Sequence, residues 1–282
     1  MTAETTATLL ILSSAMLHAV WNAAVKHSSD KFATVLFVTS YGSLLYMPFV
    51  LLVPFPDPAL WRWIALSAVC HLSYQLFLAA ALERGALTFA YPIARGTGPM
   101  LVALFAYFIL EDALPVSKLG AIALLVFGIF LTGNIDRKTT SPTAAALFYS
   151  LGTGVMIAAY TIVDALAVRS AENPFSFILW AGIAGAPAIF LVGIKRRGMA
   201  IVGASLKVWR QGLVAAIPAH GGYALALIAY TIGNLGEIAA LRETSIIFAL
   251  IIGFFWLKEP FARGKLFSAM LIASGALLIK MV

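Results

Sequence analysis

The stretch His71-Leu72-Ser73-Tyr74 has a counterpart in the second half of the chain that keeps its histidine and tyrosine, and this repeat decides the fold. The second copy is His220-Gly221-Gly222-Tyr223, and Ala94-Arg95-Gly96-Thr97 likewise returns as Leu241-Arg242-Glu243-Thr244. The offset is 149 residues for the histidines and 147 residues for the arginines. Such ordered spacing indicates two copies of one structural unit. Further matches, at an offset of 147 downstream and 139 upstream, are Lys118 with Lys265, Gly128 with Gly275, and Trp21-Asn22 with Tyr160-Thr161.

The composition is that of a membrane protein. Hydrophobic residues make up 62% of the chain, charged residues make up 11%, and the mean hydropathy is +0.96. The apolar runs are long enough to cross about 30 Å of hydrocarbon as helices. They do not alternate as strands do, and lipid leaves no backbone group unpaired. We therefore expect an all-α integral membrane protein.

We predict ten membrane-spanning helices in two inverted five-helix repeats around a central cavity. The polar stretch 134–142 is the longest connection, so we expect a first repeat over residues 1–133, a linker over 134–142 and a second repeat over 143–282. Five spans per copy force the second copy to enter the membrane upside down. The predicted spans are 6–26, 32–53, 59–82, 86–109, 116–133, 143–168, 174–194, 208–231, 235–257 and 261–281.

The basic residues predict an orientation. Of the 19 Lys and Arg residues, 13 lie at one end of the predicted spans and four at the other, and the basic end is normally cytoplasmic. This count places both termini outside, which for a bacterial inner membrane is the periplasm. It also explains the net charge of +7 without a nucleic-acid partner. The first apolar run has no basic segment before it, so we expect no cleaved signal peptide.

Motifs of soluble enzymes are absent from the sequence. The single Cys70 excludes an internal disulfide and a multi-cysteine metal site. The chain lacks a phosphate-binding loop, a zinc-protease motif and a nucleophile elbow. We therefore expect no enzyme activity, no cofactor and no bound metal. Two short stretches, Gly96-Thr97-Gly98 and Gly152-Thr153-Gly154, are interpreted as points of close helix approach.

Arg95 is the first candidate for a binding residue, because a charge inside the membrane costs about 2.5–3.5 kcal/mol on insertion scales. Pro92 and Pro99 flank it, so we expect a bent or broken helix with free backbone groups. Arg95 could hold a carboxylate or phosphate in a central cavity. Alternatively, it pairs with a nearby acid or snorkels to the interface. Its repeat mate Arg242 has partial compensation from the adjacent Glu243; the acids considered for Arg95 are Glu237, Glu243 and Asp164.

A polar and aromatic stripe is the second candidate feature. His71, Tyr74 and Gln75 share one helix face, and His220 and Tyr223 repeat that pattern. Two such stripes favour a cavity lining, although a single histidine would more often be a packing residue. Either histidine could also titrate near neutral pH and so couple transport to protons. Trp21 and Tyr160 make similar faces on two further helices. Trp21 could instead be an interfacial anchor, and Asp164 is interpreted as a solvated acid near the membrane surface.

Two motifs carry a family resemblance. Tyr91-Pro92 in the fourth predicted span, and Lys258-Glu259-Pro260 ahead of Gly264 and Gly275, resemble the EamA-type branch of the drug/metabolite transporter superfamily. Within it the chain is most similar to bacterial exporters of amino acids, including aromatic ones. The resemblance implies a basket of helices around a central cavity, with both termini in the cytoplasm. The count of basic residues predicts the opposite orientation, and we expect the orientation that this count gives. The cavity residues it implies are Trp21, His71, Tyr74, Tyr91, Tyr160, His220 and Tyr223.

We therefore expect a secondary transporter that exports amino acids or similar small metabolites by alternating access. The main alternative is a carrier of a sugar phosphate, a nucleotide sugar or a cationic drug, and a membrane-embedded enzyme is a further one. The expected partners are a small-molecule substrate and the lipid bilayer, and a monomer is compatible with the sequence. The predicted substrate-binding residues are Trp21, His71, Tyr74, Gln75, Tyr91, Arg95, Tyr160, His220 and Tyr223.

Overall fold

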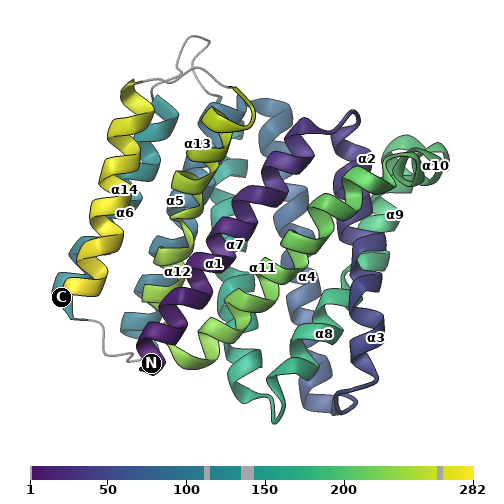
Figure 1. Cartoon of the computed structure of the whole chain (residues 1–282), viewed down its shortest axis with the longest axis horizontal. Coiled ribbons are helices and arrows are strands. Elements are labelled where there is room, and N and C mark those ends of the chain that lie inside the picture. Colours follow the sequence, from purple (N-terminus) through teal and green to yellow (C-terminus); the bar gives the residue numbers. More distant parts are fainter. Residues whose placement is uncertain (1, 111–114, 135–142, 259–262) are drawn as a thin grey trace.

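The computed structural model describes residues 2–110, 115–134, 143–258 and 263–282, and all regular structure in these ranges is helical (Figure 1). The prediction of an all-α protein is thus confirmed for the described chain. The elements are α1 (Ala3–His27), α2 (Lys31–Leu36), η1 (Phe37–Tyr41), η2 (Gly42–Tyr46), α3 (Met47–Val50), α4 (Pro58–Arg84), α5 (Leu87–Phe108), α6 (Val116–Asn134), α7 (Ala144–Ser170), α8 (Pro174–Ala184), α9 (Ala186–Arg197), α10 (Ala200–Lys207), α11 (Trp209–Ile232), α12 (Leu235–Arg242), α13 (Ser245–Phe255) and α14 (Arg263–Met281).

Eight segments of the described chain are long and apolar enough to cross a membrane, and Val116–Thr132 is a shorter apolar helix. Membrane spanning is thus supported for eight segments, and the total of ten stays a prediction. Large apolar side chains such as Val69, Phe148 and Ile217 are exposed on the outside of the bundle. Their exposure fits a surface that faces lipid hydrocarbon rather than water.

Polar residues just before the helices set several helix starts. Asp57, Thr143 and Asn234 each accept a hydrogen bond from a backbone N–H in the first turn of α4, α7 and α12, respectively. Such caps satisfy donors that a helix leaves unpaired, which matters most where lipid cannot supply a partner. Pro58 and Pro174 lie in the first turns of α4 and α8, where a missing N–H costs nothing.

The interruptions of the helices differ from the prediction. Helix α5 runs without a break from Leu87 to Phe108, although Pro92 and Pro99 lie inside it. The break occurs instead in its repeat counterpart, where Glu243 and Thr244 separate α12 from α13. The predicted span 174–194 consists of α8 and α9, and the predicted span 32–53 contains the π turn η1 and the 3-10 turn η2. Helix α10 was not predicted.

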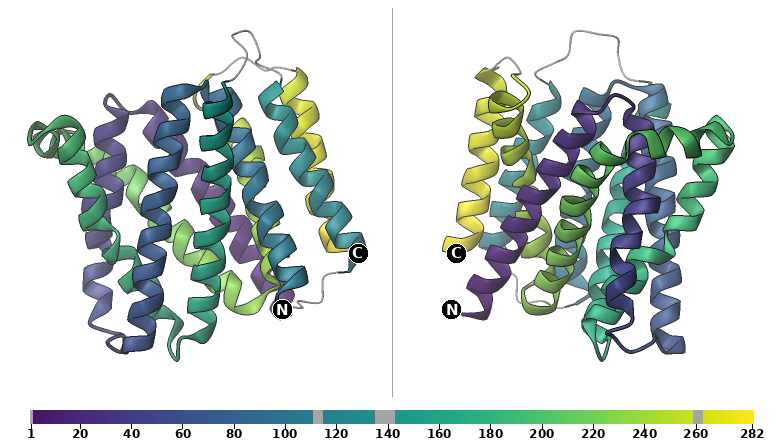
Figure 2. Two further views of the ribbon diagram at one scale, coloured as in Figure 1. Left: turned by 180° about the vertical axis from the view of Figure 1, so that it is seen from behind. Right: turned by 45° about the vertical axis from the view of Figure 1, so that its right-hand side comes forward.

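The two copies of the repeat interleave rather than fold side by side. Helix α4 packs on α7, α1 packs on α11, α5 packs on α12, and α6 packs on α14. Each pair takes one helix from either side of the linker. Helix α1 rises from the end at which both termini lie, whereas α7 runs in the opposite direction (Figures 1 and 2). Opposite directions are what inverted copies of five spans require.

Glycines allow two helix pairs to approach closely, α5 with α7, as the sequence predicts, and α6 with α14. A Cβ atom on Gly98 would lie 2.6 Å from Ile157, and one on Gly154 would lie 2.5 Å from Thr97, so α5 and α7 touch almost backbone to backbone. Between α6 and α14, a Cβ atom on Gly275 would lie 2.7 Å from Leu125. Helices without a hydrophobic driving force in lipid associate through such tight packing.

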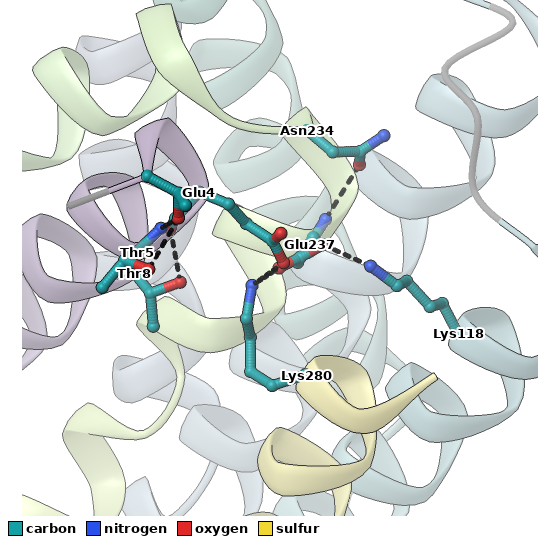
Figure 3. Close-up of polar contacts among 8 residues, drawn as sticks. Glu4, Thr5, Thr8, Lys118, Asn234, Glu237 and Lys280 are labelled. Carbon is teal, nitrogen blue, oxygen red and sulfur yellow. Dashed lines mark hydrogen bonds and ion pairs between the residues drawn. The ribbon is translucent and has the colours of Figure 1, made fainter.

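An ion cluster closes the end of the bundle where the termini lie (Figure 3). The carboxylate of Glu237 on α12 pairs with Nζ of Lys118, at 2.9 Å, and with Nζ of Lys280. Lys280 also pairs with Glu4 at 2.7 Å. The cluster joins α1, α6, α12 and α14. It also shows that Glu237, one of the acids considered as a partner of Arg95, is engaged elsewhere.

Candidate functional site

A buried carboxylate lies where α4, α7 and α11 meet. Asp164 on α7 is 1% exposed. Its Oδ1 atom accepts a hydrogen bond from Ser67 at 2.5 Å, and its Oδ2 atom lies 3.0 Å from both the Tyr223 hydroxyl and Nε2 of His71. The interpretation of Asp164 as a solvated acid is therefore wrong. It lies near the end of α7, but α4 and α11 cover it and supply three polar partners in place of water.

Aromatic rings extend from this carboxylate toward the centre of the bundle. Tyr160, one turn before Asp164 on α7, stacks on His71 with 4.2 Å between ring centroids and 20° between planes. Tyr74 meets Tyr160 edge to face at 5.6 Å, and Tyr223 meets His71 in the same manner at 6.0 Å. The spacing predicted this group, because residues three or four positions apart share a helix face. These four rings are called the aromatic wall below.

Two arginines and one glutamate form the next layer. Nε of Arg95 lies 2.9 Å from Oε2 of Glu243, in ion-pair rather than hydrogen-bond geometry, and its Nη2 donates to Ser245 at 2.8 Å. Arg95 is 7% exposed, and its guanidinium lies 5.8 Å above the ring of Tyr91. Glu243 thus compensates Arg95 from across the repeat rather than its neighbour Arg242.

Arg242 keeps an unsatisfied donor. Its Nε atom and the hydroxyl of Tyr230 are buried and have no hydrogen-bond partner within the described ranges. Both residues line a cavity of about 10 Å³, together with Arg95, Tyr160 and Glu243. That is about the room of one water molecule, so this conformation is closed. Two cations against one anion leave an excess positive charge in the bundle interior, and such a charge makes this cavity a candidate functional site.

The broken segment α12–α13 contributes to the same place. Its interruption follows Arg242 directly, and Ser245, the first residue of α13, accepts the hydrogen bond of Arg95. Discontinuous helices commonly build the substrate sites of transporters, because the broken backbone and the positive N-terminal end of the second half-helix face the ligand.

Three predicted residues lie away from this group. His220 donates a hydrogen bond from Nδ1 to Ala216 O at 2.9 Å and meets Tyr46 edge to face at 5.0 Å. Trp21 donates from Nε1 to Nδ1 of His18 at 3.2 Å. Gln75 lines a separate pocket of about 90 Å³ with residues of α2 and α9, including Phe32 and Arg196. The structure therefore brings together six of the nine predicted residues: His71, Tyr74, Tyr91, Arg95, Tyr160 and Tyr223.

The sequence carried signals for the residues that were left out of the predicted site. Asp164 lies four positions after Tyr160 and so shares its helix face. Arg242 is the repeat mate of Arg95. Within the described ranges, no group of three or more His, Cys, Asp or Glu side chains could hold a metal ion.

Comparisons with known proteins agree with this architecture. The sequence model of the family described as EamA-like transporter family matches the chain twice, over residues 5–134 and 144–281. A solved structure described only as "Crystal structure of protein" superposes with a TM-score of 0.75 and covers 98% of this chain and 98% of that chain. Its sequence identity is 14%, so the likeness concerns the fold alone. The two family matches suggest the inverted repeat directly.

Proposed function

Because the chain belongs to the EamA-like transporter family, and is thus a multi-pass membrane transporter of small molecules, we propose that it exports amino acids, aromatic ones among them. The observation that carries this proposal is that Arg95 and Arg242 line one cavity with a single carboxylate, Glu243, which pairs with Arg95, beside Tyr160 of the aromatic wall. An α-carboxylate supplies the missing negative charge, and an aromatic side chain stacks on tyrosine rings.

Arg242 is the proposed contact for the substrate carboxylate. Arg95 already has Glu243 and Ser245, whereas Nε of Arg242 has no partner in the described chain. Tyr74 and Tyr160 are the proposed contacts for the substrate side chain. The cavity of about 10 Å³ is too small for an amino acid, so the halves must move apart to admit one, as alternating access requires.

The proposed orientation places the basic end of the bundle in the cytoplasm. Lys26, Arg84 and Arg197 are at the ends of helices opposite the termini, and that end is proposed to be cytoplasmic in a bacterial inner membrane. The termini would then be periplasmic. The proposed halves are residues 1–133 and 143–282, joined by the linker 134–142. A phosphorylated metabolite is the second candidate substrate, because the same excess positive charge suits a phosphate.

The test is uptake by purified protein in liposomes, with a panel of labelled amino acids and sugar phosphates. We expect saturable flux of L-phenylalanine or another neutral amino acid. Arg242→Gln should raise KM about 10- to 100-fold, since a hydrogen bond to a charged group contributes about 1.5–3 kcal/mol. Arg210→Gln, on the basic end beside Trp209, is the matched control and should keep the KM. Flux of sugar phosphates alone would replace the amino-acid proposal with the second candidate.

A further inference from the structure

The cavity lined by Arg95, Arg242 and Glu243 is called the anion site below. Asp164 and His71 form a polar pair outside this site. Burying a carboxylate inside a membrane is costly, and such groups commonly bind ions or protons. Asp164 is buried with its side chain 2% exposed, whereas the side chain of His71 is 30% exposed. The pair therefore has one member that is fully buried and one member that is partly exposed.

The two nitrogens of His71 have different surroundings. Nε2 lies 3.0 Å from Oδ2 of Asp164, and Nδ1 makes no hydrogen bond within the described residues. Asp164 accepts from two hydroxyl groups, so it is held as an ionised acceptor, and the tautomer of His71 that completes this set carries its proton on Nε2. Nδ1 is then an unprotonated base without a hydrogen-bond partner in the described residues.

We propose that the His71–Asp164 pair binds the proton that drives transport, so that substrate leaves the cell in exchange for an entering proton. This inference rests on the proposed transport function. A proton from water adds to Nδ1 of His71, while Nε2–H stays directed at Asp164. The net charge of the pair changes from −1 to 0. Release of the same proton from Nδ1 to water on the other side of the membrane restores the starting state.

Exchange follows from the charge of the pair. An imidazolium at His71 and the ammonium group of an amino acid are both cations, and one carboxylate cannot neutralise both. The deprotonated pair therefore favours the substrate, and the protonated pair favours its release. Binding of one excludes the other, which is the condition for antiport.

The pair also reaches helices of both copies. Its donors are Ser67 and His71 on α4 and Tyr223 on α11, and the last two share Oδ2 of Asp164. A hydrogen bond from an imidazolium is stronger than one from a neutral ring. Protonation of His71 thus competes with Tyr223 for this oxygen and loosens the contact between α7 and α11, two helices that must shift for the cavity to open.

The surroundings of the pair are charged on one side only. Arg95 on α5 and Arg242 on α12 carry two positive charges, and Glu243, between α12 and α13, carries one negative charge. Helix α8 also packs on α7 and brings no titratable residue. The titratable groups that interact with Asp164 are Cys70 from α4, Tyr160 from α7 and Tyr223 from α11. Tyr74 and the three residues of the anion site are the next groups, and each of them interacts with Tyr160.

The first experiment follows proton release on substrate binding. L-phenylalanine is added to purified protein in weakly buffered detergent solution that contains a pH-sensitive dye. We expect about one proton released per L-phenylalanine bound for the natural protein. Asp164→Asn and His71→Gln should release fewer than a tenth as many. The matched controls Asp57→Asn, at the cap of α4, and His27→Gln, at the end of α1 beside Trp256, should behave as the natural protein does. Binding with no proton released, or unchanged release by Asp164→Asn, would overturn the proposal.

The second experiment needs no substrate, and it uses a variant protein only to assign one signal. The chain has four histidines, so ¹⁵N-labelled histidine gives few signals, and that of His71 is assigned by its loss in His71→Gln. We expect Nδ1 of His71 to gain a proton between about pH 8 and pH 5. A ring that stays unprotonated over this range would overturn the proton site, even if amino acids are transported. A ring that gains a proton in a protein that binds no amino acid would instead support the proton site and contradict the proposed substrate.

Discussion

Helix pairs α4–α7 and α1–α11 correspond to each other in the two copies of the domain, yet only one pair contains a carboxylate. In the first pair, His71 meets Asp164. In the second, His220 bonds to its own helix at Ala216 O, and the position on α1 that corresponds to Asp164, at the offset of 139, is Val25. The duplicated histidines thus have different chemistry. Duplication preserves the helix packing, whereas a single substitution on the neighbouring helix creates the buried acid.

The two arginines differ in the same way. Arg95 has Glu243 at 2.9 Å, whereas Arg242 has no second acid, because Gly96 stands at the position that corresponds to Glu243, at the offset of 147. A site with perfect pseudo-symmetry would have two acids or none. One acid between two arginines makes the centre cationic, and this asymmetry is what a substrate carboxylate can use.

The strongest test of this comparison is to remove each arginine in turn. Arg95→Leu leaves Glu243 buried without its partner, and breaking a buried ion pair from one side costs about 3–5 kcal/mol. Arg242→Leu leaves the Arg95–Glu243 pair intact, so we expect a much smaller loss of stability. Thermal unfolding of the detergent-solubilised variants measures the difference.

The double variant Arg95→Leu/Glu243→Leu is the control for this experiment. It removes both charges together, so most of the stability lost in Arg95→Leu should return. Equal destabilisation by the two arginine variants would mean that Glu243 serves both guanidinium groups, and the asymmetry of the anion site would then be wrong.

The fold was largely predictable because its determinants are local. Apolar runs and the repeated His71 and Arg95 motifs predicted helices and their inverted pairing. The break at Glu243–Thr244 was not predicted, because the polar stretch Arg242-Glu243-Thr244-Ser245 contains neither Pro nor Gly, the usual signals of a break. Pro92 and Pro99 were expected to bend or break their helix, and they do not break it, since both lie inside α5. Neighbouring groups in a helical membrane bundle can satisfy the freed backbone atoms.

The site was predictable only in part, because partners come from other helices. The spacing of His71, Tyr74, Tyr160 and Tyr223 revealed shared helix faces, and these four residues do meet. The burial of Asp164 depends on α4 and α11 covering it, which no distance along α7 reveals. His220 was predicted to bind substrate on the strength of its repeat mate. Its surroundings, with Val25 where the first pair has an acid, give that prediction no support.

Substitution of two corresponding glycines tests whether the helix packing of the two copies is equivalent. Gly128 and Gly275 are repeat mates in the contact of α6 with α14, and a Cβ atom on them would lie 3.0 Å from Ile272 and 2.7 Å from Leu125, respectively. We expect Gly128→Leu and Gly275→Leu each to destabilise by about 1–3 kcal/mol through overpacking. Thermal unfolding should give similar losses for both, in contrast to the arginine variants. Gly120→Leu, where a Cβ atom meets nothing within 4 Å, is the control. A large difference between the two glycine variants would show that the asymmetry extends from the charges to the packing.

The smallest expected difference concerns the helix caps that begin the second segment of each copy. Asp30 caps α2 through Ala33 N and pairs with Arg197, and Asn173 caps α8 through Phe175 N. The hydrogen bond from Ala33 N–H and then the Arg197 guanidinium hold the pKa of Asp30 below its usual value. Its contribution to stability is therefore complete above the unfolded pKa of about 4 and is lost as the pH falls through the lower, folded pKa.

Asn173 has no charge to lose, so its cap should be independent of pH. Asn caps a helix about as well as Asp, and the remaining exposed ion pair contributes about 0.2–1 kcal/mol. Asp30→Asn should thus cost no more than that at pH 7, and this cost should shrink as the pH falls below about 4 and Asp30 of the natural protein becomes protonated. Unfolding temperatures of the natural protein and the variant, measured from pH 7 down to pH 3, should converge. If the two curves stay parallel, the charge of Asp30 does not distinguish the caps, and the asymmetry between the copies is confined to the membrane interior, where an unpaired charge costs far more than at the surface.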